Sequence, residues 1–444
     1  MTHVPEFISS RWDQSNGELL VGSIPISSIA ERHGTPVFVY DDRILEEQLS
    51  GLRDVLPPRF SIYYSVKANP NPAFLTFFLG RGCGLEVASA GELQQALAAG
   101  CAPTNILFAG PGKTLAELVF AIAEGIGEIH AESELEIHRI LEISRAQRKR
   151  TAISVRVNPS EEGSGGAMRM GGKSAPFGVD EESLVPILRD ISEDQNLEFC
   201  GIHLFAGTQI LDYRVLLAQY RKGLQIAKQA ADVTGSPIRT LDFGGGLGIP
   251  YFPGDRELDR THLKAGLSDL MVSVEDDACF APSKFVLEPG RYLVGESGLY
   301  VARVNDIKVS RGKKFVILDG GMNHHLSASG NLGQVIKRNF PIAILNKFAS
   351  AAIETVDVVG PLCTPLDTLG RSVQLPAAEV GDLVGIFQSG AYARAASPLG
   401  FLSHPSPPEV LVHHEQDLLI RRRGTFEDVI QDLRNLSPQL QAVS

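Results

Sequence analysis

The sequence predicts an α/β protein built on a (β/α)8 barrel of the TIM type, followed by an antiparallel β domain. Between about residues 43 and 290, short apolar runs alternate with amphipathic helical patterns, which is typical of a closed barrel of eight strand-then-helix units. After about residue 295, strands are separated by turns and helical patterns become rare. An open doubly wound sheet is the alternative, but such sheets more often divide into two halves joined by a linker, and we find no such linker.

The expected barrel strands are short runs rich in apolar, β-branched and aromatic residues, bounded by turn residues. In chain order they are Ser61–Lys67, Leu85–Ala88, Ile106–Ala109, Glu128–Ala131, Ala152–Asn158, Cys200–Phe205, Thr240–Phe243 and Lys284–Glu288. The amphipathic stretches between them include Glu92–Ala99, Leu115–Glu124, Glu134–Ile143 and Leu216–Ala231.

The second domain is expected to contain the strands Val301–Val309, Phe315–Asp319, Thr355–Val359, Leu383–Phe387 and Glu409–Val412. A strand at Pro36–Tyr40 ends the first forty residues, which should join this β domain. We therefore expect an N-terminal segment at 1–42, a barrel at 43–290 and a β domain at 291–444. Thr425 and Asp428 have the spacing of a capping box and predict a last helix. The glycine-rich stretch Gly163–Gly172 is the candidate for a mobile loop.

Composition limits the class of protein. The chain has 444 residues, with 43% hydrophobic and 21% charged residues, as in ordinary globular proteins. It has no apolar run long enough to span a bilayer and no secretory signal at the start. A formal charge of −11 argues against nucleic acid or an anionic membrane as partner. Five scattered cysteines have no disulfide-like or metal-like spacing, which predicts a cytoplasmic protein without a metal site. The cluster Arg421–Arg423 is interpreted as a solvated strand end.

Polar residues with possible chemistry follow several expected strands, and catalytic groups of such barrels gather at the C-terminal strand ends. Lys67 ends the first strand, where it is either an ion-paired lysine or a neutral amine able to form a Schiff base. Gly244–Gly246 follow the seventh strand and form either a tight turn or a cradle for an anion. They lack the G-x-G-x-x-G spacing of a dinucleotide site, which weakens an NAD-dependent dehydrogenase as an alternative.

Taken together, these groups suit pyridoxal 5'-phosphate. Lys67 would hold the aldehyde, and the three glycines with Arg291 would hold the phosphate. Glu288, at the end of the eighth strand, would face the pyridine nitrogen and keep it protonated, so that the ring accepts electrons from the substrate Cα.

At this point the chain resembles the fold-type III pyridoxal-phosphate decarboxylases, the alanine racemase-like group that contains diaminopimelate and ornithine decarboxylases. The resemblance covers nearly the whole chain. It is carried by Tyr64–Asn69, Glu86–Leu93, Arg156–Pro159, Gly207–Gln209, Asp242–Gly246, Glu288–Arg291, Gly360–Cys363 and Gly390–Tyr392.

The resemblance implies roles for individual residues. Lys67 forms the Schiff base with the cofactor, and Glu288 pairs with the ring nitrogen. Cys363, reaching in from the partner subunit of a head-to-tail homodimer, returns a proton to Cα; the alternative is a small buried core cysteine. The remaining cofactor contacts implied by the family are Phe205, Thr208, Gly244, Gly245, Gly246, Gly290, Arg291 and Tyr392.

Departures from the family bear on the substrate. Members that act on free diamino acids have an acidic residue directly after the cysteine, where this chain has Thr364. Diaminopimelate enzymes follow Gly-Met-Asn with Arg-Pro-Ala-Leu-Tyr, where this chain has His324–Asn331. Many relatives place a histidine over the cofactor where this chain has Phe205, which can stack but cannot donate a proton.

We therefore expect decarboxylation of a modified or carrier-tethered aminoacyl group, as in secondary metabolism or in siderophore- or polysaccharide-linked pathways. The candidate substrate residues are Arg156, His324, His325 and Thr364, although the two histidines are equally compatible with capping a loop. Diaminopimelate decarboxylation for lysine synthesis is an alternative. An amino-acid racemase is disfavoured by Glu288, and a non-catalytic cofactor carrier by the presence of the C-terminal β domain.

Overall fold

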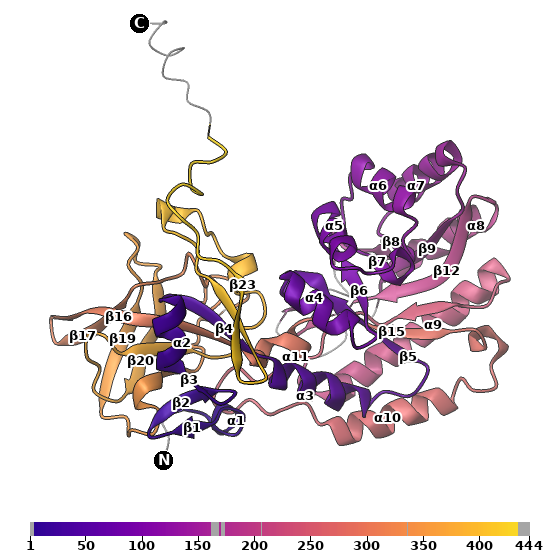
Figure 1. The fold of residues 1–444 in the computed structure, drawn as a ribbon. Helices are drawn as coiled ribbons and strands as arrows, with labels where there is room; N and C mark the ends of the chain where they lie inside the picture. Colours follow the sequence, from indigo (N-terminus) through magenta and orange to yellow (C-terminus); the bar gives the residue numbers. More distant parts are fainter. Residues whose placement is uncertain (1–3, 161–167, 170–173, 206, 335, 434–444) are drawn as a thin grey trace, which may run out of the picture. The chain divides into compact units, whose positions relative to one another are not determined.

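The structure is a computed structural model that describes residues 4–160, 168–169, 174–205, 207–334 and 336–433 (Figure 1). The chain forms two compact units. The barrel unit is Ile44–Glu296, and the β unit combines Met1–Arg43 with Ser297–Ser444. Most of the predicted loop Gly163–Gly172 lies outside the described residues.

The barrel unit contains eight parallel strands in the order β9-β12-β14-β15-β5-β6-β7-β8, and β8 pairs with β9 to close the ring. The predicted closed barrel is therefore confirmed. Its strands are β5 (Phe60–Ser65), β6 (Gly84–Val87), β7 (Ile106–Phe108), β8 (Glu128–Ala131), β9 (Thr151–Asn158), β12 (Leu197–Leu204), β14 (Thr240–Asp242) and β15 (Lys284–Leu287).

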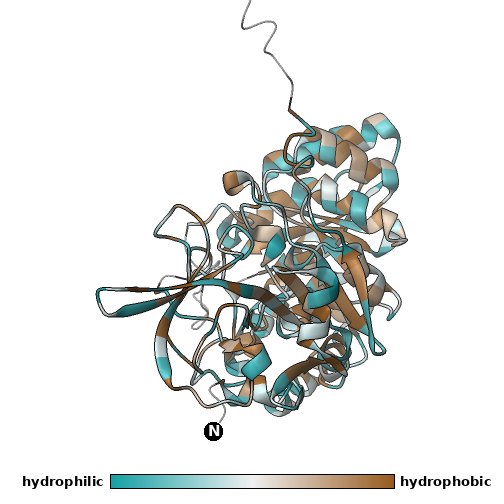
Figure 2. Ribbon diagram, turned by 60° about the vertical axis from the view of Figure 1, so that its left-hand side comes forward, coloured by the Kyte–Doolittle hydropathy of each residue, from teal (hydrophilic) through white to brown (hydrophobic). Residues whose placement is uncertain are grey.

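Amphipathic helices follow the barrel strands. Figure 2 shows them with mixed hydrophobic and hydrophilic colours, as expected for helices with one face on a sheet. Local sequence sets their ends: Thr114 and Glu117 form a capping box at α6, and Gly125 ends that helix in a left-handed conformation. The helices are α3 (Asp42–Arg53), α4 (Pro72–Leu79), α5 (Ala90–Ala98), α6 (Leu115–Glu124), α7 (Glu134–Gln147), α8 (Leu184–Ser192), α9 (Tyr213–Thr234), α10 (Arg260–Val272) and α11 (Arg291–Val294).

Short elements complete the loops of the barrel unit. Strand β11 (Val179–Asp180) pairs in parallel with β9, and β10 (Met168–Arg169) pairs antiparallel with β13 (Gly207–Thr208). The 3-10 turns are η1 (Val66–Ala68), η2 (Pro103–Asn105), η3 (Glu181–Ser183), η4 (Ala278–Phe280) and η5 (Gly295–Ser297).

The first barrel strand ends two residues earlier than predicted. Strand β5 stops at Ser65, and Lys67 lies in the 3-10 turn η1 rather than in the strand. The Tyr64 hydroxyl donates to the Asn69 carbonyl at 3.0 Å, which closes the chain into this turn ahead of Pro70. Lys67 therefore leaves the barrel wall just beyond its C-terminal edge.

The β unit is a mostly antiparallel sheet with two parallel pairings, β17 with β19 and β4 with β22. The antiparallel domain expected from the sequence is therefore confirmed, with these two parallel pairings in addition. Its strands are β4 (Val37–Asp41), β16 (Gly298–Ser310), β17 (Lys313–Leu318), β18 (Ile342–Ile344), β19 (Glu354–Val359), β20 (Thr368–Leu375), β21 (Leu383–Ile386), β22 (Glu409–His413) and β23 (Gln416–Arg421).

The N-terminal segment belongs to the β unit. Strand β4, near the predicted strand Pro36–Tyr40, pairs with β16 and β22. Ahead of it lie α1 (Glu6–Ser9), α2 (Ile26–His33) and a three-stranded sheet of β1 (Gln14–Ser15), β2 (Glu18–Val21) and β3 (Ile24–Pro25). The short helical turns of this unit are η6 (Leu345–Lys347), η7 (Arg394–Ala396) and η8 (Phe401–Ser403).

Two expectations near the C-terminus were wrong. Thr425 and Asp428 do exchange backbone-to-side-chain hydrogen bonds, at 2.9 and 3.3 Å, but the described residues that follow form turns instead of a helix. Arg423 is only partly exposed, and its guanidinium donates to the carbonyl oxygens of His33 and Pro36. Only Arg422 of this cluster fits the expectation of an exposed group, and it pairs with Asp428.

None of the described helices combines the length and apolar character needed to cross a bilayer. All five cysteines are free thiols, and Cys83, Cys101 and Cys200 are buried while Cys363 is exposed.

Gly201 offers a test of the barrel packing. Strand β12 has an irregularity between Phe199 and Gly201, and a Cβ built at Gly201 would lie 1.8 Å from the Thr240 carbonyl oxygen on β14. We expect Gly201→Ala to destabilise the barrel by about 1–3 kcal/mol, because backbone cannot yield as a flexible side chain does. Urea unfolding measures this, with Gly400→Ala as the control because a Cβ there meets open space. Equal unfolding midpoints for both variants would contradict the expectation.

Candidate active site

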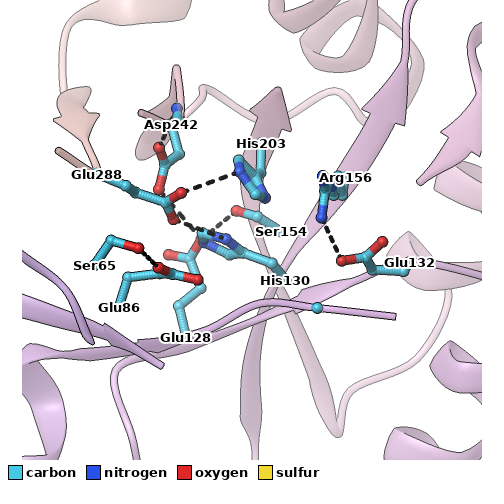
Figure 3. A network of polar contacts seen from close by, with 12 residues as sticks. Ser65, Glu86, Glu128, His130, Glu132, Ser154, Arg156, His203, Asp242 and Glu288 are labelled. Atoms are coloured by element: carbon cyan, nitrogen blue, oxygen red, sulfur yellow. Dashed lines mark hydrogen bonds and ion pairs between the residues drawn. The ribbon is translucent and has the colours of Figure 1, made fainter. Parts of the chain in front are cut away.

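Lys67 is held by a buried carboxylate at the barrel edge. Its amine donates to both oxygens of Glu86, at 3.0 and 2.9 Å, and the lysine side chain is 45% exposed while that of Glu86 is 1% exposed. Glu86 lies on β6 and also accepts a hydrogen bond from Ser65, the last residue of β5 (Figure 3). The amine is therefore fixed and accessible, in an ion pair, which is one of the two alternatives that the sequence left open.

Glu288 directly follows β15, and two histidines approach it. Its Oε2 lies 3.5 Å from His203 Nε2, and its Oε1 lies 3.8 Å from His130 Nδ1. His203 comes from β12 and His130 from β8, with ring centroids 4.4 Å apart (Figure 3). All three side chains are buried. Side chains from two non-adjacent strands, β12 and β8, thus approach the carboxylate predicted to meet the cofactor ring.

A second buried acid, Asp242 at the end of β14, lies on the same side of the barrel. Burial raises the pKa of Asp242 well above its usual value, and the nearby Glu288 carboxylate adds to the rise. Glu288 is also buried, but His203 and His130 outweigh burial and lower its pKa. Burial lowers the pKa of His203 to about 4, so its ring is neutral near pH 7. Within this carboxyl pair, burial favours the proton on Asp242, and the two histidines favour the charge on Glu288.

The glycine triplet is packed in a way that no larger residue permits. A Cβ at Gly245 would lie 2.6 Å from the Glu288 carbonyl oxygen, and Gly244 and Gly246 have positive φ angles of 67° and 93°. The amide of Gly244 donates to Asp242 at 2.7 Å. In the described part of the chain, the N–H groups of Gly245 and Gly246 have no acceptor, which leaves them available to an anion.

Phe205 and Arg156 lie beside the triplet. A Cβ on Gly244 would come within 2.9 Å of the Phe205 ring, so the ring covers that glycine. The Arg156 guanidinium lies 5.8 Å from the centre of the Phe205 ring and donates to Glu132 at 2.6 Å. Its charge therefore already has a protein partner, and its predicted substrate contact stays a prediction.

The other predicted cofactor residues of the barrel unit lie in neighbouring loops. Arg291 donates to the Tyr251 hydroxyl at 2.7 Å. A Cβ on Gly290 would lie 2.9 Å from Ala68, so this glycine allows the loop after β15 to pack against the turn that carries Lys67. Thr208 is half-buried in β13.

Cys363 belongs to a loop of the β unit that one buried carboxylate organises. Asp367 accepts from the backbone amides of Met322 at 2.6 Å and Leu362 at 2.9 Å. A Cβ on Gly321 or Gly360 would collide with that carboxylate. The loop therefore presents Cys363 exposed and the following Thr364 half-buried.

His324 and His325 lie inside the β unit, 2% and 0% exposed. His324 Nδ1 lies 3.1 Å from the Tyr300 hydroxyl, and His325 Nε2 lies 2.9 Å from the Ser389 hydroxyl. These contacts favour the loop-capping alternative over direct substrate binding. The same loop is joined to the Tyr392 carbonyl by a 2.8 Å hydrogen bond from Ser327.

The sequence analysis assigned no role to Glu86, His130, Asp242 or Glu132. Each is a polar residue within or directly after a barrel strand that is otherwise apolar. Strands of a parallel barrel are buried on both faces, so an acid or imidazole there calls for a specific reason. A single polar residue inside an apolar strand was therefore the signal in the sequence that could have identified these four residues.

Known proteins with similar sequences are decarboxylases, as the residues of this site suggest. A family model described as the pyridoxal binding domain of pyridoxal-dependent decarboxylases matches residues 43–295. The chain is 37% identical over 408 residues to the L-glutamyl-[BtrI acyl-carrier protein] decarboxylase of Niallia circulans, covering 91% of this chain and 95% of that protein. It is 31% identical over 420 residues to the diaminopimelate decarboxylase of Aquifex aeolicus, covering 94% and 96%.

Solved structures show the same fold. AQ1208 from Aquifex aeolicus superposes with a TM-score of 0.83 at 30% identity, covering 96% of this chain and 98% of that one. The diaminopimelate decarboxylase of M. jannaschii in complex with L-lysine gives 0.86 at 26% identity, covering 97% and 98%. The chain belongs to the pyridoxal-dependent decarboxylase family. It is a carboxy-lyase that decarboxylates an α-amino acid or an aminoacyl derivative.

The buried histidines predict how stability depends on pH. Burial lowers the pKa of His325 to about 3, whereas the unfolded chain has the ordinary value of 6.5. Below pH 6.5 the unfolded state takes up a proton that the folded state refuses, so stability falls with falling pH, by up to about 1.4 kcal/mol per pH unit for this group. We expect His325→Gln to remove that part of the slope between pH 6 and 4.5, measured from urea midpoints. The control is His262→Gln, an exposed histidine; parallel curves for His325→Gln and the wild type would contradict the prediction.

Proposed function

We propose that the barrel unit binds pyridoxal 5'-phosphate, with Lys67 as its attachment point and Glu288 at the ring nitrogen. The observation that carries this proposal is the state of Glu288. It is 5% exposed, its pKa is lowered against the effect of burial, and its Oε1 has no hydrogen-bond partner among the described residues. A buried carboxylate oxygen that accepts no hydrogen bond needs a donor. The protonated ring nitrogen of pyridoxal phosphate would supply that donor to Glu288 Oε1.

The neighbouring groups fit the rest of the cofactor. The two free amides of the glycine triplet suit a phosphate, and Arg291 and Thr208 lie in adjacent loops. Phe205 has an apolar ring of the right kind to cover one face of a pyridine and exclude water from it.

When bound, pyridoxal phosphate supplies an electron sink for the bonding pair left at Cα by the departing carboxylate. The protein would keep that sink effective, because Glu288 would hold the proton on the ring nitrogen. Glu86 fixes the Lys67 amine and can take or return its proton as the substrate amine enters. A carboxylate that lies against apolar groups such as Phe205 loses hydration, which favours its release as neutral carbon dioxide.

We further propose that Cys363 and Tyr392 enter this site from a second copy of the chain in a homodimer. Cys363 is exposed on a loop that Asp367 holds rigid, as a group working in another protomer requires. Its thiol would protonate Cα after decarboxylation. Tyr392 would contact the phosphate.

The proposed substrate is an aminoacyl group carried as a thioester on a carrier protein, with glutamyl as the first candidate. Support comes from the 37% identical relative, which acts on a glutamyl carrier protein. Thr364 also lacks the negative charge that would bind the distal ammonium of a free diamino acid. Free diaminopimelate is the second candidate, since several relatives and solved structures of similar fold are diaminopimelate decarboxylases.

The cofactor assignment is tested by Lys67→Ala. We expect the purified wild-type protein, saturated with pyridoxal phosphate, to absorb in the visible region, and the variant to lose both that band and turnover by at least about 1,000-fold, as removal of a covalent group requires. Lys113→Ala is a poor control because this buried lysine pairs with Glu136. Lys228→Ala, an exposed lysine on α9, serves instead and should retain the band. A visible band that survives in Lys67→Ala would refute the assignment.

The substrate assignment is tested by carbon dioxide release from a matched series. The series contains glutamate free, as a pantetheine thioester and on a carrier protein, together with free diaminopimelate and ornithine. We expect kcat/KM for tethered glutamate to exceed that for either free diamino acid by at least about 100-fold, or about 2.7 kcal/mol of transition-state binding. Faster release from free diaminopimelate would favour the second candidate.

A further inference from the structure

Gln209 lies where three loops of the barrel unit meet, and the mechanism above gives it no role. Strands β12, β14 and β15 are neighbours in the barrel, so the loops that follow them lie side by side at one edge. These loops carry the residues proposed to hold the cofactor phosphate, which are Thr208, Gly245, Gly246 and Arg291.

The side chain of Gln209 binds the backbone of a residue in the loop after β14. Its Oε1 accepts from the Ile249 amide at 3.3 Å, and its Nε2 donates to the Ile249 carbonyl oxygen. A glutamine side chain that meets both backbone groups of one residue reproduces the exchange by which two strand residues pair. Ile249 is 1% exposed, so its backbone groups need such partners.

Main-chain contacts extend the connection between the loops after β12 and β14. The Ile210 amide donates to the Gly246 carbonyl oxygen at 2.9 Å, and the Gly248 amide donates to the Ile210 carbonyl oxygen at 2.9 Å. A Cβ on Gly246 would lie 2.9 Å from the Gly207 carbonyl oxygen. The two loops therefore pack backbone against backbone beside the glycine triplet.

Ile249 also contacts the loop after β15. A Cβ on Gly295 would collide with Ile249 Cδ1, so this glycine leaves the space that the isoleucine side chain fills. Gly295 directly follows α11, which begins at Arg291. Two residues beyond Ile249, the Tyr251 hydroxyl accepts from Arg291 at 2.7 Å. The residue that Gln209 binds thus lies between the glycine triplet and the partner of Arg291.

The backbone of Gln209 is itself constrained. Its φ angle is 60°, in the left-handed region that residues other than glycine seldom adopt. Such conformations persist where the surrounding structure fixes them. Glycine would adopt this conformation at no steric cost, so a glutamine here costs conformational energy that its two hydrogen bonds to Ile249 offset.

We propose that Gln209 is a positioning residue for the cofactor phosphate, because it holds the loops after β12 and β14 together so that Thr208, the glycine triplet and Arg291 act on one anion. This inference rests on the proposed function and adds to it a residue that does not itself touch the cofactor. Donors on separate loops bind weakly when each loop must be ordered on binding. The phosphate of the cofactor therefore depends on Gln209, whereas the aldehyde does not.

Pyridoxal phosphate and pyridoxal, which lacks the phosphate, separate these two dependences. The cofactor-free protein is titrated with each, and the visible absorbance of the product gives the dissociation constant. We expect Gln209→Ala and Gln209→Gly to weaken binding of pyridoxal phosphate by about 10–100-fold, the range for groups that orient a binding residue, and to change binding of pyridoxal by less than about twofold. Equal losses for both ligands would indicate a general effect on the fold and overturn the inference.

The glycine variant distinguishes the side chain from the backbone. Glycine adopts a positive φ without strain, so Gln209→Gly would bind pyridoxal phosphate as tightly as the wild type if the side chain had no task. That result would also overturn the inference. Arg148→Ala and Arg148→Gly are the matched controls, since Arg148 has a φ of 53° at the exposed end of α7. Both should bind the two ligands as the wild type does.

Tyr251→Phe tests the connection to Arg291 and leaves Gln209 unaltered, so it serves even where the Gln209 variants fail to fold. It removes the hydroxyl that accepts from Arg291 and should weaken binding of pyridoxal phosphate more than binding of pyridoxal; unchanged binding of both would contradict the inference. In the double variant with Gln209→Gly, we expect a loss smaller than the product of the two single losses, because both changes release the same guanidinium. A loss equal to that product would refute the connection.

The two proposals fail in different ways. A wild-type protein that gives no visible band with pyridoxal phosphate would reject the proposed function itself. A wild-type band together with any of the contrary results above would leave that function standing and reject only the role of Gln209.

Discussion

The burial of Glu288 is the constraint on which the site depends. A carboxylate that is 5% exposed inside a barrel stays ionised only where the protein provides compensating groups. An imidazole approaches Glu288 from each of two strands, and burial raises the pKa of the nearby Asp242, which favours its uncharged form. On the proposed function, the same region receives the ring nitrogen of the cofactor, which would satisfy the Glu288 Oε1 that has no partner in the described part of the chain. Polar residues in this barrel core are costly for folding, and on the proposed function their benefit is the binding of the cofactor.

The closed barrel makes that arrangement possible. Lys67, His130, His203 and Glu288 lie far apart in the sequence, yet each lies on a barrel strand or directly after one. Parallel strands in register bring their carboxyl ends to one edge, so a polar residue at each end points into a common space. Two glycines also allow the loops of the site to pack closely. Gly245 and Gly290 permit backbone approaches that a Cβ would block, and these approaches pack the loops after β14 and β15 against their neighbours.

The sequence predicted the barrel well because each of its strands is an apolar run between amphipathic helices. It predicted the β unit less well for a physical reason. Strand β20 has mostly exposed residues in its middle, and β23 has exposed Leu418 and Leu419, so neither shows the alternation by which a half-buried strand is recognised. The helix expected at Thr425 is absent from the described residues although its capping contacts form, because capping alone cannot stabilise a segment whose apolar side chains, such as Phe426 and Ile430, are exposed. Single residues such as His130 were missed because pattern analysis averages over a run, whereas their role depends on three-dimensional neighbours.

Phe205 narrows the possible sources of the proton that must reach Cα. A phenyl ring has no proton to give, so the residue that covers the glycine loop can shape and dry the site but cannot take part in proton transfer. On the proposed mechanism, the remaining donors are the Lys67 amine, held by Glu86, and the thiol of Cys363, held by the Asp367 loop. Decarboxylation needs one proton delivered to one face, whereas racemisation needs removal and delivery on opposite faces. Phe205 cannot transfer a proton, and an anionic Glu288 would stabilise the electron sink. Both features therefore favour decarboxylation, which needs only one proton delivered to Cα, over racemisation.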